Sequence, residues 1–488
     1  MRFLLAASLA LFGIVSVTAP AGAAGTEERI RLLETQLQQM QQELQNLRKE
    51  ADREREEAKR AQEATKKAQQ EQERKTDVVA EAIDTLKSSL TIPEEMKLEG
   101  KYGLAPAAAK VYGRERGLSI GGYGEVVFRV PTSEKVQTAG GVTVDQARTD
   151  MQRLILYTGY KFNDWIVFNS ELEFEHGATD PTITQGSGGE VEVEFAYIDF
   201  FLRDYVNVRS GLVLAPMGII NEVHEPVAFF GVDRPLVDQT IIPSTWREVG
   251  GGLFGEPFPG FEYRLYAYDG FNAVGFRPAG LRGGRQKGSR ALANDWAFIG
   301  RADYEPTEGL LVGTSVYSGN SGQGQTIESE SGEGVAIPGT LTTIWEAHGQ
   351  YRWRGLEARG EVAMAWLGDS KQLTEALREL GEIGSSDTIA SEMLGMYVEV
   401  GYDVLQWVLE DTEQQFLPFF RYEYNNTQLR TPSGEDFQPN DFFEDRIWTI
   451  GVNYKPIPQV VLKADYRDWN PVTGEKADTV DFGLGFVF

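Results

Sequence analysis

From residue 118 to residue 488, apolar and polar residues alternate in short segments that come in pairs. Alternation with a period of two is typical of β-strands that have one apolar and one polar face. In the segment 165–176, Phe168 and Leu172 share one face, and Asn169 and Glu171 share the other. The pattern predicts about sixteen strands, at 118–130, 149–162, 165–176, 190–202, 206–215, 246–255, 261–268, 294–305, 309–318, 341–353, 356–367, 393–405, 415–426, 445–455, 459–469 and 477–488.

The connections between these segments alternate in length. Tight turns lie at 162–165, 203–205, 257–260, 306–309, 354–355 and 456–458, and most of the other connections are longer and rich in Gly, Ser, Asn and Asp. Short turns on one rim and long loops on the other are typical of bacterial outer-membrane barrels. In a soluble sandwich the apolar face would form the core. The paired loop lengths and the aromatic C-terminus at Phe488 favour a transmembrane barrel of about 16 antiparallel strands, with its apolar face outward.

The first 23 residues have the features of a secretory signal peptide. Arg2 supplies a positive charge, residues 3–17 are apolar, and residues 21–23 are small. A membrane anchor is the alternative, but the apolar stretch is short for a span and is followed by a cleavage pattern. We therefore expect an exported chain with a signal peptide at 1–23. The absence of cysteine excludes disulfides, Cys-ligated zinc and a lipoprotein anchor.

Residues 26–92 are predicted to form a long α-helical coiled coil in the periplasm. A solvated single helix is the alternative for the polar middle of this region, but a coiled coil would cover an apolar seam that a lone helix leaves exposed. Residues 93–117 are interpreted as a linker to the barrel at 118–488. The seam consists of residues at alternating spacings of three and four, namely Ile30, Leu33, Leu37, Met40, Leu44, Leu47 and Ala51.

The net charge of −26 comes from the predicted barrel, since the region from Leu118 onward holds 28 basic and 54 acidic residues. This balance excludes a general nucleic-acid binder. The acids on the polar strand faces would line the lumen, although acids on outer loops would only solubilise the chain. The facing charges form either a stabilising ladder of salt bridges or a field that selects ions. The predicted wall residues are Arg153, Glu171, Glu173, Glu192, Glu194, Arg209, Arg264, Arg301, Arg352, Arg359 and Arg421.

The third long loop, residues 216–244, is unusually apolar, with Phe229, Phe230, Ile241 and Ile242. An exposed loop of this composition is unfavourable in water. We expect the third loop to fold into the lumen, whereas a contact with a neighbouring subunit is the alternative. In the inward arrangement the loop would place charged and polar residues at a pore constriction, namely Glu222, His224, Glu225, Asp233, Arg234 and Asp238.

Four stretches carry a resemblance to a known family. Residues 209–218 (RSGLVLAPMG), 221–226 (NEVHEP), 241–246 (IIPSTW) and 250–255 (GGGLFG) resemble the phosphate-selective porin O/P family. The resemblance covers most of the region 118–488. It implies a sixteen-stranded, trimeric outer-membrane porin with an inward third loop, and the helical prefix fits porins with periplasmic helices. The third loop departs from a phosphate channel because it carries mainly carboxylates beside Arg234.

These observations predict a porin for passive diffusion of small ions and hydrophilic solutes in the outer membrane. We expect no enzyme, no cofactor and no nucleophile elbow, and no metal, because His176, His224 and His348 lack a metal-binding spacing. The expected partners are outer-membrane lipid, lipopolysaccharide and two further copies in a homotrimer, with peptidoglycan as a candidate contact of the coiled coil. The alternatives are an envelope tether anchored by the barrel and a channel specific for phosphate or oligosaccharides.

Overall fold

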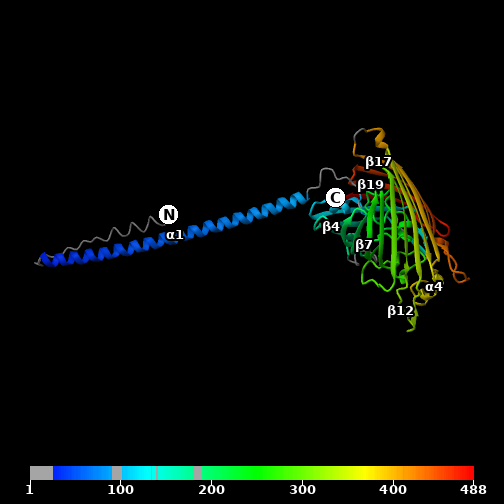
Figure 1. Cartoon of the computed structure of the whole chain (residues 1–488), viewed down its shortest axis with the longest axis horizontal. Helices are drawn as coiled ribbons and strands as arrows, with labels where there is room; N and C mark the ends of the chain where they lie inside the picture. Colours follow the sequence, from blue (N-terminus) through cyan, green and yellow to red (C-terminus); the bar gives the residue numbers. More distant parts are fainter. Residues whose placement is uncertain are drawn as a thin grey trace. The chain divides into compact units, whose positions relative to one another are not determined.

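The computed structural model of the 488-residue chain describes residues 26–90, 100, 102–132, 135–138, 141–144, 146–179, 188–409 and 412–488 (Figure 1). The predicted signal peptide and most of the first half of the predicted linker lie outside the described residues. The chain divides into two compact units, Met1–Ser88 and Ser89–Phe488. The first unit is described by one helix and the second by the strands.

Helix α1 (Thr26–Leu90) occupies the region in which the sequence predicts a coiled coil. Its seam residues Ile30, Leu33, Leu37 and Leu44 are each more than half exposed, up to 62% for Leu33. A helix of this length forms readily from a sequence rich in Glu, Gln, Lys, Arg and Ala. The coiled coil itself stays a prediction. Among the described residues, none of the helices has the length and the apolar character that crossing a membrane requires.

The second unit is built on a closed barrel of sixteen antiparallel strands, which confirms the predicted antiparallel barrel and its strand number. Consecutive barrel strands are hydrogen-bonded neighbours, and the first pairs with the last. The strands are β1 (Gly117–Pro131), β4 (Arg148–Lys161), β5 (Ile166–Glu175), β6 (Val191–Arg203), β7 (Val206–Leu214), β8 (Arg247–Phe258), β9 (Phe261–Asp269), β10 (Trp296–Thr307), β11 (Leu310–Asn320), β14 (Leu341–Trp353), β15 (Leu356–Leu367), β16 (Glu392–Tyr402), β17 (Gln415–Arg430), β18 (Glu444–Ile457), β19 (Val460–Pro471) and β20 (Thr479–Val487).

The barrel closes where β1 meets β20. Tyr123 is opposite Val487, and the terminal Phe488 exchanges two backbone hydrogen bonds with Gly122, at 2.9 and 3.0 Å. Closure leaves none of the sixteen barrel strands with an open edge, which is the condition for a β-sheet to exist in hydrocarbon. The alternation predicted for the last strand is present, since Phe482 is exposed outside and Asp481 is buried inside.

A β-bulge interrupts the regular alternation of faces in β6. The register between β5 and β6 shifts at Glu171/Leu172. Val193 is exposed on the outer face, as the alternation predicts, but Phe195 is 1% exposed and lies on the inner side with Glu194. An extra residue in one strand reverses the faces beyond it, and this reversal is invisible in a simple count of alternating residues.

The long-loop rim carries structure of its own. Two hairpins lie outside the barrel sheet, β2 (Lys135–Thr138) with β3 (Gly141–Val144) and β12 (Thr326–Glu328) with β13 (Gly334–Ala336). Helix α4 (Ser370–Glu379) lies in the loop between β15 and β16, where residues 373, 376, 377 and 380 are apolar at helical spacing (Figure 1). Its Leu373 and Leu377 are fully buried, so the helix is amphipathic and packs by its apolar side.

Candidate functional site

The third loop crosses the inside of the barrel. Its backbone is held by side chains of strands on the far wall. The N–H of Ile219 donates to Glu361 of β15 at 2.9 Å, and that of Val232 donates to Asp465 of β19 at 2.6 Å. Arg421 of β17 donates to the carbonyl of Phe230 at 2.7 Å. The loop therefore lies in the lumen, and its apolar composition has a physical cause, because Phe229, Ile241 and Ile242 are buried within their own chain.

Two carboxylates of the loop set predicted at the constriction form ion pairs with basic side chains of the barrel wall. Glu222 forms ion pairs with Arg264 of β9 and, at 3.7 Å, with Arg301 of β10. Asp233 pairs with Arg129 of β1 and, at 2.8 Å, with Arg467 of β19.

Three further members of the predicted loop set are also buried or half-buried. Both carboxylate oxygens of Asp238 and the Nη2 of Arg234 are buried without a hydrogen-bond partner. Glu225 accepts hydrogen bonds from the backbone N–H groups of Ala107 at 3.0 Å and Ala108 at 3.4 Å. Because buried polar atoms without a hydrogen-bond partner are costly, a water molecule would be favourable beside Arg234 and Asp238.

Most of the predicted wall residues face inward in buried ion pairs. Arg209 of β7 makes two hydrogen bonds to Asp199 of β6, at 2.8 and 2.9 Å. Glu399 of β16 lies between Arg359 and Arg421, at 2.6 Å from each. The wall thus contains the ladder of paired charges that the sequence leaves open as one of two alternatives.

The remaining wall predictions fall in several places. Arg153 faces Glu125 at 3.5 Å, and Glu173 is buried. Glu192 pairs with Arg247 and with Lys287 of the loop 270–295. Arg352 differs from the others, because its side chain is 63% exposed and reaches Glu357 at only 3.9 Å. It lies at the rim with the short turns, so it does not line the middle of the lumen.

Residues 102–113, which we call the plug segment, lie inside the barrel although the sequence suggests a linker there. The segment contains α2 (Pro106–Ala109) and the 3-10 helix η1 (Lys110–Gly113). The Tyr112 hydroxyl donates to Asp199 at 2.7 Å, and Asn169 donates to the carbonyl of Ala108 at 2.9 Å. The plug segment therefore occupies the side of the lumen formed by β1 and β4–β9, at the rim with the short turns.

A close approach of backbone to wall makes this placement possible. A Cβ atom at Gly159 of β4 would lie 2.6 Å from the side chain of Val111. The small side chains of Ala107, Ala108 and Ala109 are buried against the same wall. The sequence offers two signals for this contact, the alanines at 107–109 and the glycine at 159. Both features are too common to predict the contact.

A second missed element covers the third loop from the long-loop side. The loop 270–295, which we call the cap loop, contains η2 (Ala273–Gly275) and η3 (Arg282–Gly284). Phe271 stacks on Trp246 with ring centroids 4.4 Å apart, and Leu281 donates to the carbonyl of Thr240 at 2.9 Å. Thr427 of β17 donates to the carbonyl of Pro278 at 2.7 Å. Phe271, Phe276 and Leu281 are buried. Apolar residues in a long loop were the available sequence signal that the cap loop folds inward, as they were for the third loop.

A cavity of about 510 Å³ remains on the side of the lumen that the plug segment leaves open. Val223, Val227 and Phe230 of the third loop line its inner wall. Its strand residues come from β11, β14–β15 and β17–β18 near the short turns, and include Arg352, Glu357, Arg359 and Lys455. The cavity is therefore a vestibule with more basic than acidic side chains.

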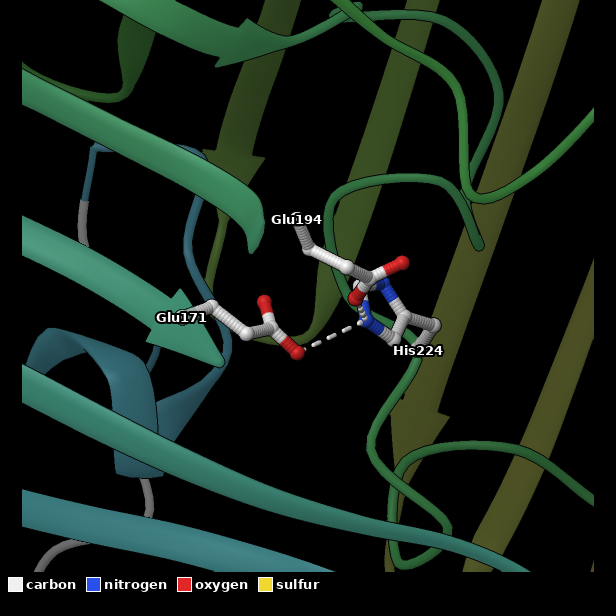
Figure 2. Close-up of side chains that lie close together, drawn as sticks. All are labelled: Glu171, Glu194 and His224. Carbon is white, nitrogen blue, oxygen red and sulfur yellow. Dashed lines mark hydrogen bonds and ion pairs between the residues drawn. The ribbon is translucent and has the colours of Figure 1, made fainter. Parts of the chain in front are cut away.

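One cluster brings together residues that the sequence separates widely (Figure 2). The Nε2 of His224 in the third loop lies 3.2 Å from Glu194 of β6 and 3.6 Å from Glu171 of β5. The sequence predicts these residues in the third loop and the lumen wall but predicts no metal site, because His224 has no second ligand at a metal-binding spacing along the chain. Their ligand atoms converge because β5 and β6 are neighbouring strands and the third loop crosses beside them. The spacing of the three residues along the chain could not show this convergence.

The pattern Gly-x-Ser-x-Gly does occur, at residues 117–121, and corrects the expectation that the chain has no such motif. In the structure these residues are the start of β1 and pair with β4 from Lys161 to Tyr157. A nucleophile elbow requires a sharp turn from a strand into a helix. Ser119 lies in an extended strand, so the match has no catalytic geometry.

These features define a class: a closed sixteen-stranded antiparallel barrel with an inward third loop and an interior rich in paired charges. An uncharacterized protein of Aquifex aeolicus (strain VF5) is 34% identical over 386 residues, which cover 78% of this chain and 82% of the relative. The chain belongs to the same family as that protein. No protein-family model matches the chain.

Solved structures with a similar arrangement include the Salmonella typhi OmpF complex with daunomycin and the outer membrane channel DcaP of Acinetobacter baumannii. The OmpF structure is 10% identical with a TM-score of 0.48, and the match covers 77% of this chain and 98% of OmpF. The DcaP structure is 13% identical with a TM-score of 0.48, and the match covers 76% of this chain and 97% of DcaP.

Proposed function

We propose that this protein is an outer-membrane channel through which small ions and hydrophilic solutes diffuse passively, with the third loop as its constriction. The observation that carries the proposal is the reversed polarity of the barrel. Large apolar side chains such as Phe298, Ile450 and Val398 are more than half exposed on the outer face, while charged side chains are buried inside. An apolar belt around a closed barrel is unfavourable in water and suited to lipid. The predicted signal peptide agrees with export.

The lumen is expected to prefer cations. Among the described residues, nineteen carboxylates and nine Lys or Arg side chains are buried. An excess of carboxylates attracts cations and repels anions. A specific observation favours the alternative, a channel for phosphate or another anion: the vestibule holds Arg352, Arg359 and Lys455 against Glu357. The resemblance to phosphate-selective porins supports that alternative as well.

The first test is the reversal potential of the purified full-length protein in a planar bilayer under a salt gradient. We expect a potential of the sign that indicates cation preference, because the buried carboxylates outnumber the basic groups. An anion preference would instead assign selectivity to the basic vestibule. If neither the full-length protein nor a variant that lacks residues 26–112 conducts, the channel proposal is wrong and the tether is favoured.

The Glu225 carboxyl gives the channel a pH dependence. Burial raises the pKa of Glu225 to about 7, against the hydrogen bonds from Ala107 and Ala108, which lower it. When the plug segment leaves, the Glu225 carboxyl becomes hydrated and its pKa returns toward the ordinary range. Between these two pKa values the seated form binds a proton that the released form does not, so acid favours the seated plug segment and the preference is lost as the pH rises through about 7.

We therefore expect the conductance per channel to increase from pH 5 to pH 8. The charged and titratable groups that face Glu225 are His224, Lys110, Glu171 and Tyr157. The variant Glu225→Gln keeps an acceptor oxygen but cannot titrate, so its conductance should vary much less over this range. An equal pH dependence in both proteins would assign the effect to one of the neighbours.

We further propose that α1 forms a coiled coil that joins three copies. The exposed seam at Leu33 and Leu37 supports this proposal. The double variant Leu33→Glu/Leu37→Glu should convert detergent-solubilised trimers to monomers, as measured by light scattering after gel filtration, because charges in a seam oppose helix association. The control Gln38→Glu/Gln41→Glu changes the charge equally outside the seam. Trimers that survive in the seam variant would leave the tether as the role of α1.

A further inference from the structure

We propose that Glu171, Glu194 and His224 form a binding site for one divalent transition-metal ion of the Zn²⁺ type. The ion would fasten the third loop to strands β5 and β6. This inference goes beyond passive diffusion, which needs no metal. Figure 2 shows the two carboxylates and the imidazole pointing toward one another from three separate elements.

The spacing of the ligand atoms suits a small ion. One ligand atom from each residue lies within 4.8 Å of the other two. The Nε2 of His224 is 3.2 Å from Glu194 Oε2 and 3.6 Å from Glu171 Oε1. Ligand atoms of a tetrahedral zinc with bonds of about 2.0–2.1 Å are about 3.3 Å apart. The two distances from the imidazole are therefore already close to the separation that a bound ion requires, and the two carboxylates lie within 4.8 Å of each other. A fourth position would be left for water.

The carboxylate of Glu171 supplies an independent sign of a missing ligand. Glu171 is 1% exposed, and neither of its two oxygens has a hydrogen-bond partner. Oε1 of Glu194 also lacks a hydrogen bond, although Arg247 lies 3.5 Å away. A buried carboxylate that has no hydrogen bond, and whose ion-pair contact is an imidazole 3.6 Å away, carries a large desolvation penalty. A divalent cation between Glu171 and Glu194 would satisfy both groups.

The orientation of the imidazole also fits a metal ligand. Nδ1 of His224 lies 3.0 Å from the carbonyl oxygen of Asn221, which can only accept a hydrogen bond. The Asn221 carbonyl therefore keeps a proton on Nδ1, while Nε2 faces the Glu194 carboxylate at 3.2 Å. A bound ion would take the place of the proton through which Nε2 contacts Glu194. Asn221 is held in turn, because its amide donates to the carbonyl of Ala215 and accepts from the N–H of Trp246, both at 2.7 Å. The ring is thus positioned by a second layer of rigid contacts.

The ligand set determines the class of ion. One imidazole and two carboxylates favour Zn²⁺ and similar transition metals, whereas Mg²⁺ and Ca²⁺ prefer sites made of oxygen only. The site is almost completely buried, with each of the three residues at most 2% exposed. An ion would enter while the barrel folds and would leave slowly.

The test uses the full-length protein folded with and without Zn²⁺ and then freed of loose metal by gel filtration. We expect one zinc per chain by mass spectrometry of the metal content. X-ray absorption of this zinc should show nitrogen and oxygen ligands at about 2.0–2.2 Å, including an imidazole. The variants Glu171→Gln and His224→Gln should each lower zinc affinity at least tenfold. The controls Glu175→Gln and His176→Gln remove a carboxylate and a histidine just outside the cluster and should keep the zinc.

Several outcomes would overturn the inference. They are a wild-type barrel that holds no zinc after folding with it, zinc retained equally by Glu171→Gln and His224→Gln, or displacement of zinc by equimolar Ca²⁺. If a variant fails to fold, the imidazole signature in the wild-type absorption spectrum decides the question. The metal content is measured independently of ion conduction. A failed zinc test therefore leaves the channel proposal unaffected, and a failed conductance test leaves the zinc site unaffected.

Discussion

A chain that lacks residues 26–112 is expected to conduct several times more current per open channel than a chain that lacks only residues 26–98. The longer deletion removes the plug segment, whereas the shorter one removes helix α1 and leaves the plug segment in place. The plug segment is buried between the wall and the third loop, where it covers Asn169 and Asp199. Taking it out exposes that side of the lumen to water and widens the path. Single-channel recording in planar bilayers measures the difference.

The matched pair of deletions separates the plug segment from the helix. Both variants lose α1, so an effect of oligomer assembly would appear in both. If both variants conduct as much as the full-length protein, the third loop or the cap loop controls the current. If both variants conduct equally and more than the full-length protein, helix α1 is responsible for the closure. The folded state of each barrel is checked by circular dichroism before recording.

The variant Arg209→Ala is expected to lower the free energy of unfolding by about 3–5 kcal/mol, because it leaves a buried carboxylate without its counter-charge. Arg209 holds Asp199 through two hydrogen bonds of 2.8 and 2.9 Å, and its guanidinium lies 4.1 Å from the ring centre of Tyr197. The same arginine donates to Tyr112 at 3.2 Å, so the substitution also loosens the plug segment. Unfolding in urea from lipid vesicles measures the loss.

Two controls distinguish a lost ion pair from general damage. Arg203→Ala removes an exposed arginine whose guanidinium donates to the carbonyl of the neighbouring Leu202 at 2.6 Å, and should change the free energy by less than about 0.5 kcal/mol. The double variant Arg209→Met/Asp199→Leu removes both charges and should recover most of the stability. The explanation fails if Arg209→Ala unfolds no more easily than Arg203→Ala.

The strands were predictable because their signal is local. Each barrel strand shows its two faces within about ten residues, and the short turns on one rim mark where one strand ends and the next begins. Helix α4 was predictable for the same reason, since Leu373 and Leu377 lie four residues apart on one side of a helix. The inward position of the third loop followed from its composition, because apolar residues such as Ile241 and Ile242 require a buried environment.

The candidate site was only partly predictable. The sequence identified Glu171, Glu194 and His224 as lumen residues, but not that they meet, because the contact depends on where the loop crosses the barrel. Arg352 alternates like the other wall arginines and still lies at the rim. Asp199, the partner of Arg209, was missed because a single aspartate in an apolar strand has no distinctive pattern.

The sequence by itself determined the barrel, its strand number, the polarity of its faces and the inward third loop, because each depends on patterns along neighbouring residues. Only the tertiary structure decided how the lumen is filled. The plug segment meets the wall through Val111 and Gly159, the β-bulge turns Phe195 inward, and the cap loop reaches β17 through Pro278. These contacts join residues far apart in the chain, and their energies depend on burial and pairing that exist only once the barrel has closed.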